Sequence, residues 1–369
     1  MRIGFVVNHP TQFEVPFYQY VAKNFPHDEF EIFYLKEQEN QHYDNELRQS
    51  VKWGFDLFEG YPFLFLPQEG KLSVFREKLK EKTYNLIIIN GYKNQYAGFA
   101  AICKGLKIKV ALKLDSVLFN QPFYKIWLRK IFLKKEYKKF DHFLVTGKVS
   151  KDYCLEMGIP ENQINLFSYC VDNSYFNLSG KEDSDYFKKI KQKYQPNHEI
   201  AILSVAKFVG RESPWDILRA FVKLGRKDLV LILIGDGNER GALEKFAQKK
   251  AHLKIFFPGY IPYQHLPEFY KLSSIFIHAA KDEPWGVSVQ EAIAGDCFVI
   301  CSDKVGAAQD LLVEGENGFT YQYGNSEELA DDIATALNIP KEKIKNANEK
   351  ILNKWNYHTM WQEIISASK

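Results

Sequence analysis

The chain has few cysteines and no long apolar run. Its 369 residues include five cysteines without a Cys-x-x-Cys pair: Cys103, Cys154, Cys170, Cys297 and Cys301. This pattern excludes a cysteine zinc site and a disulfide framework, and it indicates buried thiols in a reducing compartment. No apolar run approaches the roughly 20 residues of a membrane-spanning helix, and the first residues have a strand pattern, not that of a signal peptide. We therefore expect a cytoplasmic protein, which could still touch a membrane from that side.

The sequence has no strong excess of either charge. Its formal net charge is +3, which by itself does not indicate a nucleic-acid-binding protein. The basic residues are unevenly spread, since residues 101–150 contain 12 Lys and Arg against 3 Asp and Glu. Within this region, residues 124–140 combine seven basic side chains with a helical pattern of apolar ones. Two interpretations stay open: a surface helix whose lysines lie over its own domain, or a patch that binds anionic lipid.

Strand-like apolar runs alternate with helix-like segments in two successive series. The first series starts at residues 2–7 and includes 110–114, and the second starts at 199–206 and includes 229–235. Runs that are apolar throughout are typical of parallel strands covered on both faces. The length of the chain and this order predict an α/β protein with two doubly wound, Rossmann-like domains. Ligands of such domains bind beyond the carboxyl ends of the strands.

A strand, a turn and a helix between residues 275 and 295 form the strongest candidate site. The apolar run 275–280 predicts a buried strand, and Pro284 and Gly286 predict a turn before the helix. Backbone N–H groups near Gly286, Val287 and Ser288 have no partner inside the helix, and the helix dipole is positive there. This end of the helix can therefore receive a phosphate group.

Two carboxylates accompany this helix end. Glu283 lies in the turn, and Glu291 lies one helical turn beyond Val287 on the same face. One carboxylate could accept hydrogen bonds from ribose hydroxyls and the other from sugar hydroxyls, which suits a nucleotide-sugar. An ordinary strand–turn–helix with two solvated glutamates would show the same spacing, so this alternative stays open.

The residues around the two glutamates resemble a known family. Glu283 and Glu291 have the spacing of the Glu-x7-Glu motif of retaining glycosyltransferases with the GT-B fold, the group 1 or glycogen-synthase-like family (family 4 type). The resemblance continues through residues 291–295, 299–306 and 317–319. It is clear from about residue 200 to 335 and thinner before that range.

The resemblance implies roles for further residues of the second domain. Lys207 stands at the family's arginine position, and Arg211 precedes Glu212, which stands at the usual lysine position. We therefore assign Lys207 and Arg211 as the cations that stabilise the leaving diphosphate, and Glu283 as the catalytic carboxylate. A Gly-Asp-Gly turn and a later loop, where relatives hold the base, complete the donor site. The implied donor-binding residues are Glu291, Gly286, Val287, Ser288, Gly235, Asp236, Tyr260 and Ile261.

In the first domain, the loop after the first strand would face the acceptor. Its polar candidates are His9, Thr11 and Gln12, and hydrogen bonds that stabilise the loop are their alternative role. Many relatives have a histidine near the end of a later strand, where this chain has Lys113 and Asp115. This departure leaves the family's amino-terminal catalytic residue without a counterpart. Asp115 is a candidate for contact with the acceptor or the transferred sugar, with helix capping as the alternative.

The resemblance also implies that the two domains bind different substrates. It predicts a GT-B protein whose two domains face a central cleft. Residues 1–180 would bind the acceptor and residues 181–352 the nucleotide-sugar, while a helix at about 353–369 would pack back on the first domain.

The function expected from these features is retaining sugar transfer by a hexosyltransferase. The donor is a nucleotide-diphosphate sugar, and the acceptor is a glycan or a lipid-linked glycan in cell-surface polysaccharide or glycoconjugate synthesis. No cluster of carboxylates suggests a bound metal, so we expect no metal and no cofactor besides the donor. The alternatives are a GT-B sugar-nucleotide epimerase or phosphorylase, and a non-catalytic module of the same fold that binds glycan or lipid.

Overall fold

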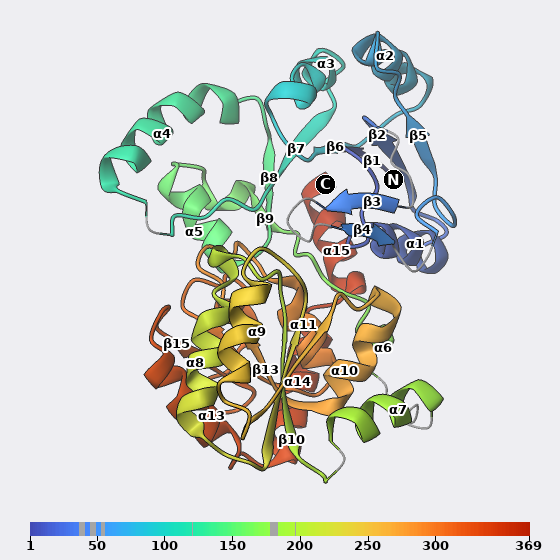
Figure 1. Ribbon diagram of the computed structural model, residues 1–369. Helices are drawn as coiled ribbons and strands as arrows, with labels where there is room; N and C mark the ends of the chain where they lie inside the picture. The colour runs from blue at the N-terminus through green and yellow to red at the C-terminus, as the bar shows by residue number, and fades with distance from the viewer. Residues whose placement is uncertain (37–40, 45–48, 53–55, 120, 178–183, 196) are drawn as a thin grey trace. The chain divides into compact units, whose positions relative to one another are not determined.

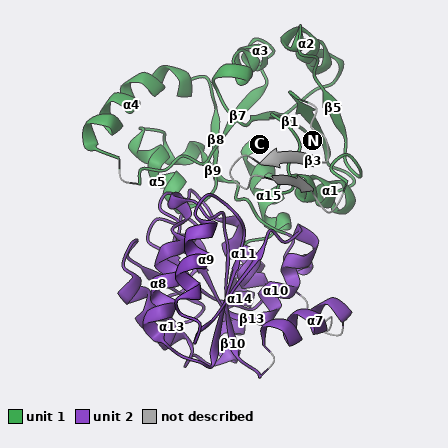
Figure 2. Cartoon of the chain, viewed as in Figure 1, with its two compact units in different colours: residues 1–40, 55–171, 355–369 green, residues 41–54, 172–354 purple. Residues whose placement is uncertain are grey.

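Two parallel β-sheets organise the chain, and each belongs to a separate unit (Figures 1 and 2). The computed structural model describes residues 1–36, 41–44, 49–52, 56–119, 121–177, 184–195 and 197–369. Unit 1 comprises Met1–Asn40, Phe55–Val171 and Trp355–Lys369. Unit 2 comprises Gln41–Gly54 and Asp172–Lys354.

The sheet of unit 1 has seven strands in the order β5-β2-β1-β6-β7-β8-β9. Every neighbouring pair is parallel, and Phe5 of β1 lies in register with Ile32 of β2 and Ile88 of β6. The strands of unit 1 are β1 (Arg2–Val7), β2 (Glu29–Tyr34), β5 (Phe63–Phe65), β6 (Leu86–Ile89), β7 (Lys109–Leu114), β8 (His142–Val145) and β9 (Ile164–Leu166). β6 reads Leu-Ile-Ile-Ile and is buried at all four positions, as expected for a strand covered on both faces.

Helices connect these strands and cover the sheet of unit 1. They are α1 (Val15–Asn24), α2 (Lys71–Glu81), α3 (Phe99–Gly105), α4 (Phe123–Tyr137), α5 (Lys148–Glu156) and α15 (Tyr357–Ser368), with short 3-10 turns η1 (Asn94–Tyr96) and η2 (Glu161–Gln163). Phe33, Phe75 and Phe99 lie in one core cluster, where their rings meet edge to face. The core of unit 1 therefore joins helices α2 and α3 to the sheet.

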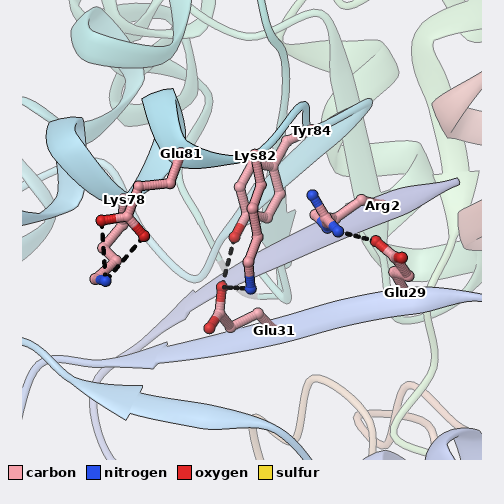
Figure 3. A network of polar contacts seen from close by, with 7 residues as sticks. All are labelled: Arg2, Glu29, Glu31, Lys78, Glu81, Lys82 and Tyr84. Atoms are coloured by element: carbon pink, nitrogen blue, oxygen red, sulfur yellow. Dashed lines mark hydrogen bonds and ion pairs between the residues drawn. The ribbon is translucent and has the colours of Figure 1, made fainter.

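Charged side chains gather near the amino ends of β1 and β2 (Figure 3). Arg2 pairs with Glu29, and Glu31 accepts a hydrogen bond of 2.5 Å from the Tyr84 hydroxyl. Lys82 lies 3.9 Å from the same Glu31 carboxylate. Because several of these groups are exposed, each ion pair contributes little to stability.

Helix α15 packs within unit 1, although it ends the chain. The Trp361 side chain is fully buried, and its Nε1 donates a hydrogen bond of 2.9 Å to Asp28. Its ring lies 6.2 Å from that of Phe17 and 5.9 Å from that of Phe30. The last helix thus completes the packing of α1 and the neighbouring strand.

The sheet of unit 2 has six parallel strands in the order β12-β11-β10-β13-β14-β15. Its strands are β10 (Ile200–Val205), β11 (Leu229–Ile234), β12 (Lys254–Gly259), β13 (Ser273–His278), β14 (Phe298–Ser302) and β15 (Gly318–Tyr321). β11 is apolar and buried along its whole length, which again matches a strand covered on both faces.

The remaining elements of unit 2 connect and flank this sheet. The helices are α6 (Asn173–Phe176), α7 (Asp185–Tyr194), α8 (Pro214–Leu224), α9 (Arg240–Gln248), α10 (Leu266–Leu272), α11 (Val287–Ala294), α12 (Ala308–Leu311), α13 (Ser326–Ala336) and α14 (Lys341–Lys354), with 3-10 turns η3 (Gly210–Glu212) and η4 (Tyr263–His265). Pro214 opens α8, where its missing N–H costs nothing, and the Asn325 side chain caps α13. A separate antiparallel pair, β3 (Gln41–Asp44) and β4 (Gln49–Lys52), lies in a segment that the sequence analysis left unassigned.

The predicted strands and helices agree with the structure to within a few residues, but the first boundary between the units differs. The sequence analysis placed it at residue 180, whereas the units divide between Val171 and Asp172. The cause is α6, whose Asn173 Oδ1 accepts a hydrogen bond of 2.9 Å from Gln290 of α11. The predicted boundary itself falls within residues 178–183, which lie outside the described residues.

Two expectations about composition can also be compared with the structure. Among the described residues, all five cysteines are buried thiols outside any disulfide, as predicted. Across the described ranges, no helix combines the length and the apolar character that crossing a membrane requires.

Candidate active site

The sheet of unit 2 has a topological switch point between β10 and β13. The chain proceeds from β10 outward to β11 and β12, then returns to place β13 on the other side of β10. Ligands of doubly wound sheets bind beyond the carboxyl ends of the strands at such a point. The loop after β10 carries Lys207 and Arg211, and the loop after β13 carries Glu283. The fold therefore brings the three predicted catalytic residues of unit 2 to one edge of the sheet.

Backbone hydrogen bonds join the loops along this edge in the order of the strands. The loop after β11 bonds to β12 through Gly235 N and Gly259 O (3.0 Å), and to the loop after β10 through Phe208 N and Asp236 O (2.8 Å). Lys281 N then donates to Arg211 O (2.7 Å), which bridges the switch point. These bonds hold the predicted donor loops as one connected rim.

Glycines at two positions allow the loops to approach so closely. Gly235 has φ +140°, and a Cβ there would lie 1.9 Å from the Ala206 carbonyl oxygen. Gly286 has φ +97°, and its added Cβ would meet Val305 and His278 at 3.2 and 3.3 Å. Any side chain at Gly235 would separate the loops after β10 and β11.

Glu283 lies half-buried in a loop that bonds to the segment following β14. Its N–H donates to Lys304 O (3.0 Å), and its carbonyl accepts from Gly306 N (2.9 Å). The Glu283 carboxylate accepts a weak hydrogen bond of 3.3 Å from the backbone N–H of Trp285. Trp285 is buried, so it anchors the loop while the Glu283 side chain remains partly open.

The two predicted cations differ in their surroundings. Lys207 is half-buried in the loop after β10. The Arg211 side chain is 54% exposed, and its Nε lies 3.1 Å from the Glu212 carboxylate, which is nearly buried. The acidic residue that departs from the family pattern therefore pairs with the predicted second cation.

Glu291 lies one turn into α11 and is buried, with only 4% of its surface exposed. Its Oε2 accepts a hydrogen bond of 2.7 Å from the Tyr270 hydroxyl on α10. Burial raises the pKa of Glu291 to about 7, and the Tyr270 hydrogen bond only partly opposes that rise. The Glu291 carboxyl group inside unit 2 therefore gains or loses its proton near pH 7.

The predicted Gly-Asp-Gly turn is held by a residue that the sequence analysis missed. The Asp236 carboxylate accepts from Gly237 N (2.7 Å) and pairs with Arg240 Nη1 (2.7 Å). Arg240 also donates to the Phe257 carbonyl, beside the loop that contains Tyr260 and begins after Gly259. Asp236 therefore has a local structural role, and its i,i+4 spacing from Arg240 was a signal for it.

Tyr260 and Ile261 follow β12, at the same carboxyl edge, and both are half-buried. Val287 and Ser288 begin α11 and are also half-buried, so their backbone lies near the surface. The donor-binding residues predicted from the sequence thus lie along one edge of the unit 2 sheet.

The predicted acceptor residues lie at the carboxyl edge of the unit 1 sheet. His9 Nδ1 lies 3.0 Å from the Pro10 carbonyl oxygen, and Gln12 is half-buried in the same loop. The Thr11 hydroxyl accepts from Glu14 N (3.2 Å), so it has the loop-stabilising role that was the alternative. Asp115 is exposed and accepts a hydrogen bond of 3.3 Å from the Tyr169 hydroxyl.

A buried ion pair at this edge was not predicted. Lys113 Nζ lies 2.5 Å from Glu14 Oε1, and Asn90 Nδ2 donates to the same oxygen (3.0 Å). The Lys113 ammonium also lies 4.6 and 4.2 Å from the ring centroids of Phe167 and Tyr169. Burial disfavours the charged form of Glu14, but the Lys113 charge and the surrounding hydrogen bonds outweigh it and lower the pKa. The signal was a single lysine inside an apolar strand, 99 residues from its partner.

The described ranges contain no group of three or more His, Cys, Asp and Glu side chains arranged to hold a metal ion. The predicted independence of metal remains to be tested on the protein.

Comparison with known proteins shows which proteins the sequence of unit 2 resembles. Residues 185–352 match the family model described as glycosyl transferases group 1. An uncharacterised glycosyltransferase, MJ1069 of Methanocaldococcus jannaschii, is 25% identical over 267 residues, which are 70% of this chain and 64% of that protein. The chain thus spans less than two thirds of the length of this relative.

A second relative comes from Campylobacter jejuni and matches 73% of each chain at 22% identity. It is named N-acetylgalactosamine-N,N'-diacetylbacillosaminyl-diphospho-undecaprenol 4-alpha-N-acetylgalactosaminyltransferase.

Solved structures show the same fold over the whole chain. A glycosyltransferase from Rickettsia africae has a TM-score of 0.78 at 17% identity and covers 100% of this chain and 98% of its own. Anabaena Alr3699/HepE, solved in complex with UDP, has a TM-score of 0.75 at 16% identity with 99% of both chains covered. These likenesses establish the GT-B fold that the sequence predicted. Residues 185–352, within unit 2, carry the match to the group 1 glycosyltransferases.

Proposed function

We propose that this protein transfers a sugar from a nucleotide-diphosphate sugar to a glycan or lipid-linked acceptor, with retention of the anomeric configuration. The observation that carries the proposal is the connected rim of unit 2. It places Lys207, Arg211, Glu283 and the first turn of α11 at one switch point. These are the groups that a departing diphosphate and a sugar would need.

The cations and the helix end have an electrostatic role in this scheme. The bond between the anomeric carbon and the diphosphate breaks, and the diphosphate gains negative charge as it leaves. Lys207, Arg211 and the N–H groups near Gly286, Val287 and Ser288 stabilise that charge. Arg211 also pairs with Glu212, which neutralises part of the guanidinium charge before a donor binds. We expect no metal ion in this step.

Glu283 and Glu291 have different tasks. Glu283 is partly open and accepts hydrogen bonds from hydroxyls of the transferred sugar. Glu291 accepts hydrogen bonds from the ribose of the donor. Anabaena HepE has been solved in complex with UDP and with UDP-glucose, which makes UDP-sugars the first donors to test.

Helix α4 supports the proposal of a membrane-proximal acceptor. Its apolar side chains point to solvent, and Phe123, Phe132 and Trp127 are 80%, 72% and 55% exposed. Leu133 and Tyr137 form its buried face. In Figure 1, α4 lies at the periphery of unit 1. An exposed apolar helix followed by lysines suits the boundary of an anionic lipid layer. The Campylobacter relative is named for a diphospho-undecaprenol substrate, which favours a lipid-linked acceptor.

The test is a panel of nucleotide-sugars incubated with lipid-linked and soluble glycan acceptors. The expected result is one donor that stabilises the protein by mass action and yields an α-linked product from an α-linked donor. Glu283→Ala should lower turnover with little change in donor affinity. Transfer that needs added metal, an inverted linkage, or release of an epimerised nucleotide-sugar from donor alone would overturn the proposal.

A further inference from the structure

Glu291 is enclosed by three helices of unit 2. It lies on α11, while Tyr270 of α10 donates to its Oε2 and α6 packs against both helices. The Tyr270 side chain is fully buried. Among the residues that the structure describes, Tyr270 is the one hydrogen-bond donor to this carboxylate.

The Tyr270 hydroxyl is fixed by its surroundings. Its ring meets that of Phe176 nearly edge to face at 5.7 Å and that of Phe276 at 5.5 Å. At the end of α11, a Cβ added to Gly295 would lie 2.6 Å from the Tyr270 Cβ, so α10 and α11 approach closely here. The ring therefore cannot turn away from α11 without moving its neighbours, and its hydroxyl keeps one direction.

The two oxygens of Glu291 consequently differ. Oε2 is held by Tyr270, whereas within the described part of the chain no group donates to Oε1. Across the described ranges, Glu291 also has no ion pair with a cation, and burial raises its pKa to about 7. A carboxylate in this state gains most from further hydroxyl donors on its remaining oxygen.

We propose that Tyr270 is a positioning residue for donor recognition. Its hydroxyl holds Glu291 in the orientation that directs Oε1 to the 2′- and 3′-hydroxyls of the donor's ribose. This inference rests on the proposed function, since it needs a nucleotide at the edge of unit 2. It adds the residue that makes Glu291 selective for ribose.

The experiment measures discrimination between a nucleotide with ribose and one with dideoxyribose, and not affinity alone. Wild type, Tyr270→Phe and Glu291→Gln are titrated by calorimetry with UDP and GDP, and the tighter ligand is compared with its 2′,3′-dideoxy analogue. Tyr194→Phe is the matched control, because Tyr194 is also a buried tyrosine of unit 2 and packs on Phe256 and Phe269.

Wild type and Tyr194→Phe should prefer the ribonucleotide, and Tyr270→Phe should lower that preference roughly tenfold, the scale of one charge-assisted hydrogen bond. In the Glu291→Gln background, Tyr270→Phe should change the preference no further. A purely structural Tyr270 would leave the ratio unchanged in Tyr270→Phe, and that result would overturn this inference while the proposed function stands. If wild type binds none of the nucleoside diphosphates, with ADP and CDP titrated as well, the proposed function fails together with this inference.

Discussion

Glu291 makes the stability of unit 2 depend on pH. Its pKa in the folded protein is about 7 against an ordinary value of 4.5, so the folded state holds the proton more tightly than the unfolded chain. The stabilisation that unit 2 gains from the protonated Glu291 is complete below about pH 4.5, and it is lost as the pH rises to about 7. Linkage gives a loss of about 3 kcal/mol over this range. Glu291→Gln should therefore gain stability relative to wild type when urea unfolding is compared at pH 5 and pH 8. A constant difference between the two proteins would show that Glu291 titrates normally.

Lys207 and Arg211 should differ in their contributions to catalysis. Lys207→Ala should lower the turnover number by roughly 10²-fold, the scale seen when one charge-stabilising donor is lost. Arg211→Ala should have a smaller effect, because Glu212 already neutralises part of the guanidinium charge. Steady-state kinetics with the identified donor tests this order, and Lys223→Ala on α8 is a control of the same side-chain type. A larger loss in Arg211→Ala would reverse the assignment.

The Glu14–Lys113 pair should stabilise unit 1 only when both partners are present. Lys113→Met leaves a buried carboxylate without its cation, which costs about 3–5 kcal/mol. Glu14→Gln combined with Lys113→Met should recover much of that loss, since no charge then remains buried. Hydrogen exchange of the β1 and β7 amides reports on this unit separately. A double variant as unstable as Lys113→Met alone would indicate that packing, and not charge, is lost.

At the scale of elements, the exposed face of α4 mixes apolar side chains with Lys125 and Lys130 and becomes more basic toward the carboxyl end of the helix. Its exposed large apolar side chains all lie between residues 123 and 132: Phe123, Tyr124, Trp127, Leu128, Ile131 and Phe132. Exposed lysines follow at and just beyond its carboxyl end: Lys134, Lys135, Lys138 and Lys139. The apolar part could enter a lipid layer while the lysines stay among the headgroups.

We expect the protein to bind anionic vesicles and to leave them as salt is added. Each lysine near the surface contributes about 1 kcal/mol, so replacing these four lysines by Glu should abolish binding. Donor affinity should stay unchanged, because these residues belong to unit 1. Four Lys→Glu changes on α14, at Lys341, Lys345, Lys350 and Lys354, provide a control with equal charge. Self-association through α4 without vesicle binding, seen by analytical ultracentrifugation, would replace this interpretation with a protein interface.

Sequence patterns predicted the strands and the loops of the unit 2 edge because both are local. Apolar runs such as Leu229–Ile234 predict a buried strand, and Pro284 with Gly286 predicts the turn that follows β13. The family resemblance then placed Lys207 and Glu283 on neighbouring loops. Tyr270 was missed because its partner is 21 residues away on another helix, where no local pattern relates them. The Glu14–Lys113 pair was missed for the same reason, because its partners are 99 residues apart and no local pattern relates them.

At the scale of the whole molecule, unit 1 depends on the last helix of the chain. The buried Trp361 lies against Phe17 and Phe30, and its Nε1 donates to Asp28. Trp361→Ala should cost unit 1 about 3–5 kcal/mol, as expected for a large buried aromatic side chain. Exchange of the β1 and β2 amides should accelerate while those of β10 and β11 keep their protection. Equal acceleration in both sheets would mean that the two units unfold as one.

The position of α15 at the end of the sequence also determines when unit 1 can finish folding during synthesis. Unit 1 is built from three stretches of chain, and the last of them, Trp355–Lys369, is synthesised after every residue of unit 2. The surface that Trp361 covers on α1 therefore stays uncovered while the whole of unit 2 is made. Throughout that time, the nascent protein presents chaperones with a unit 1 that lacks helix α15.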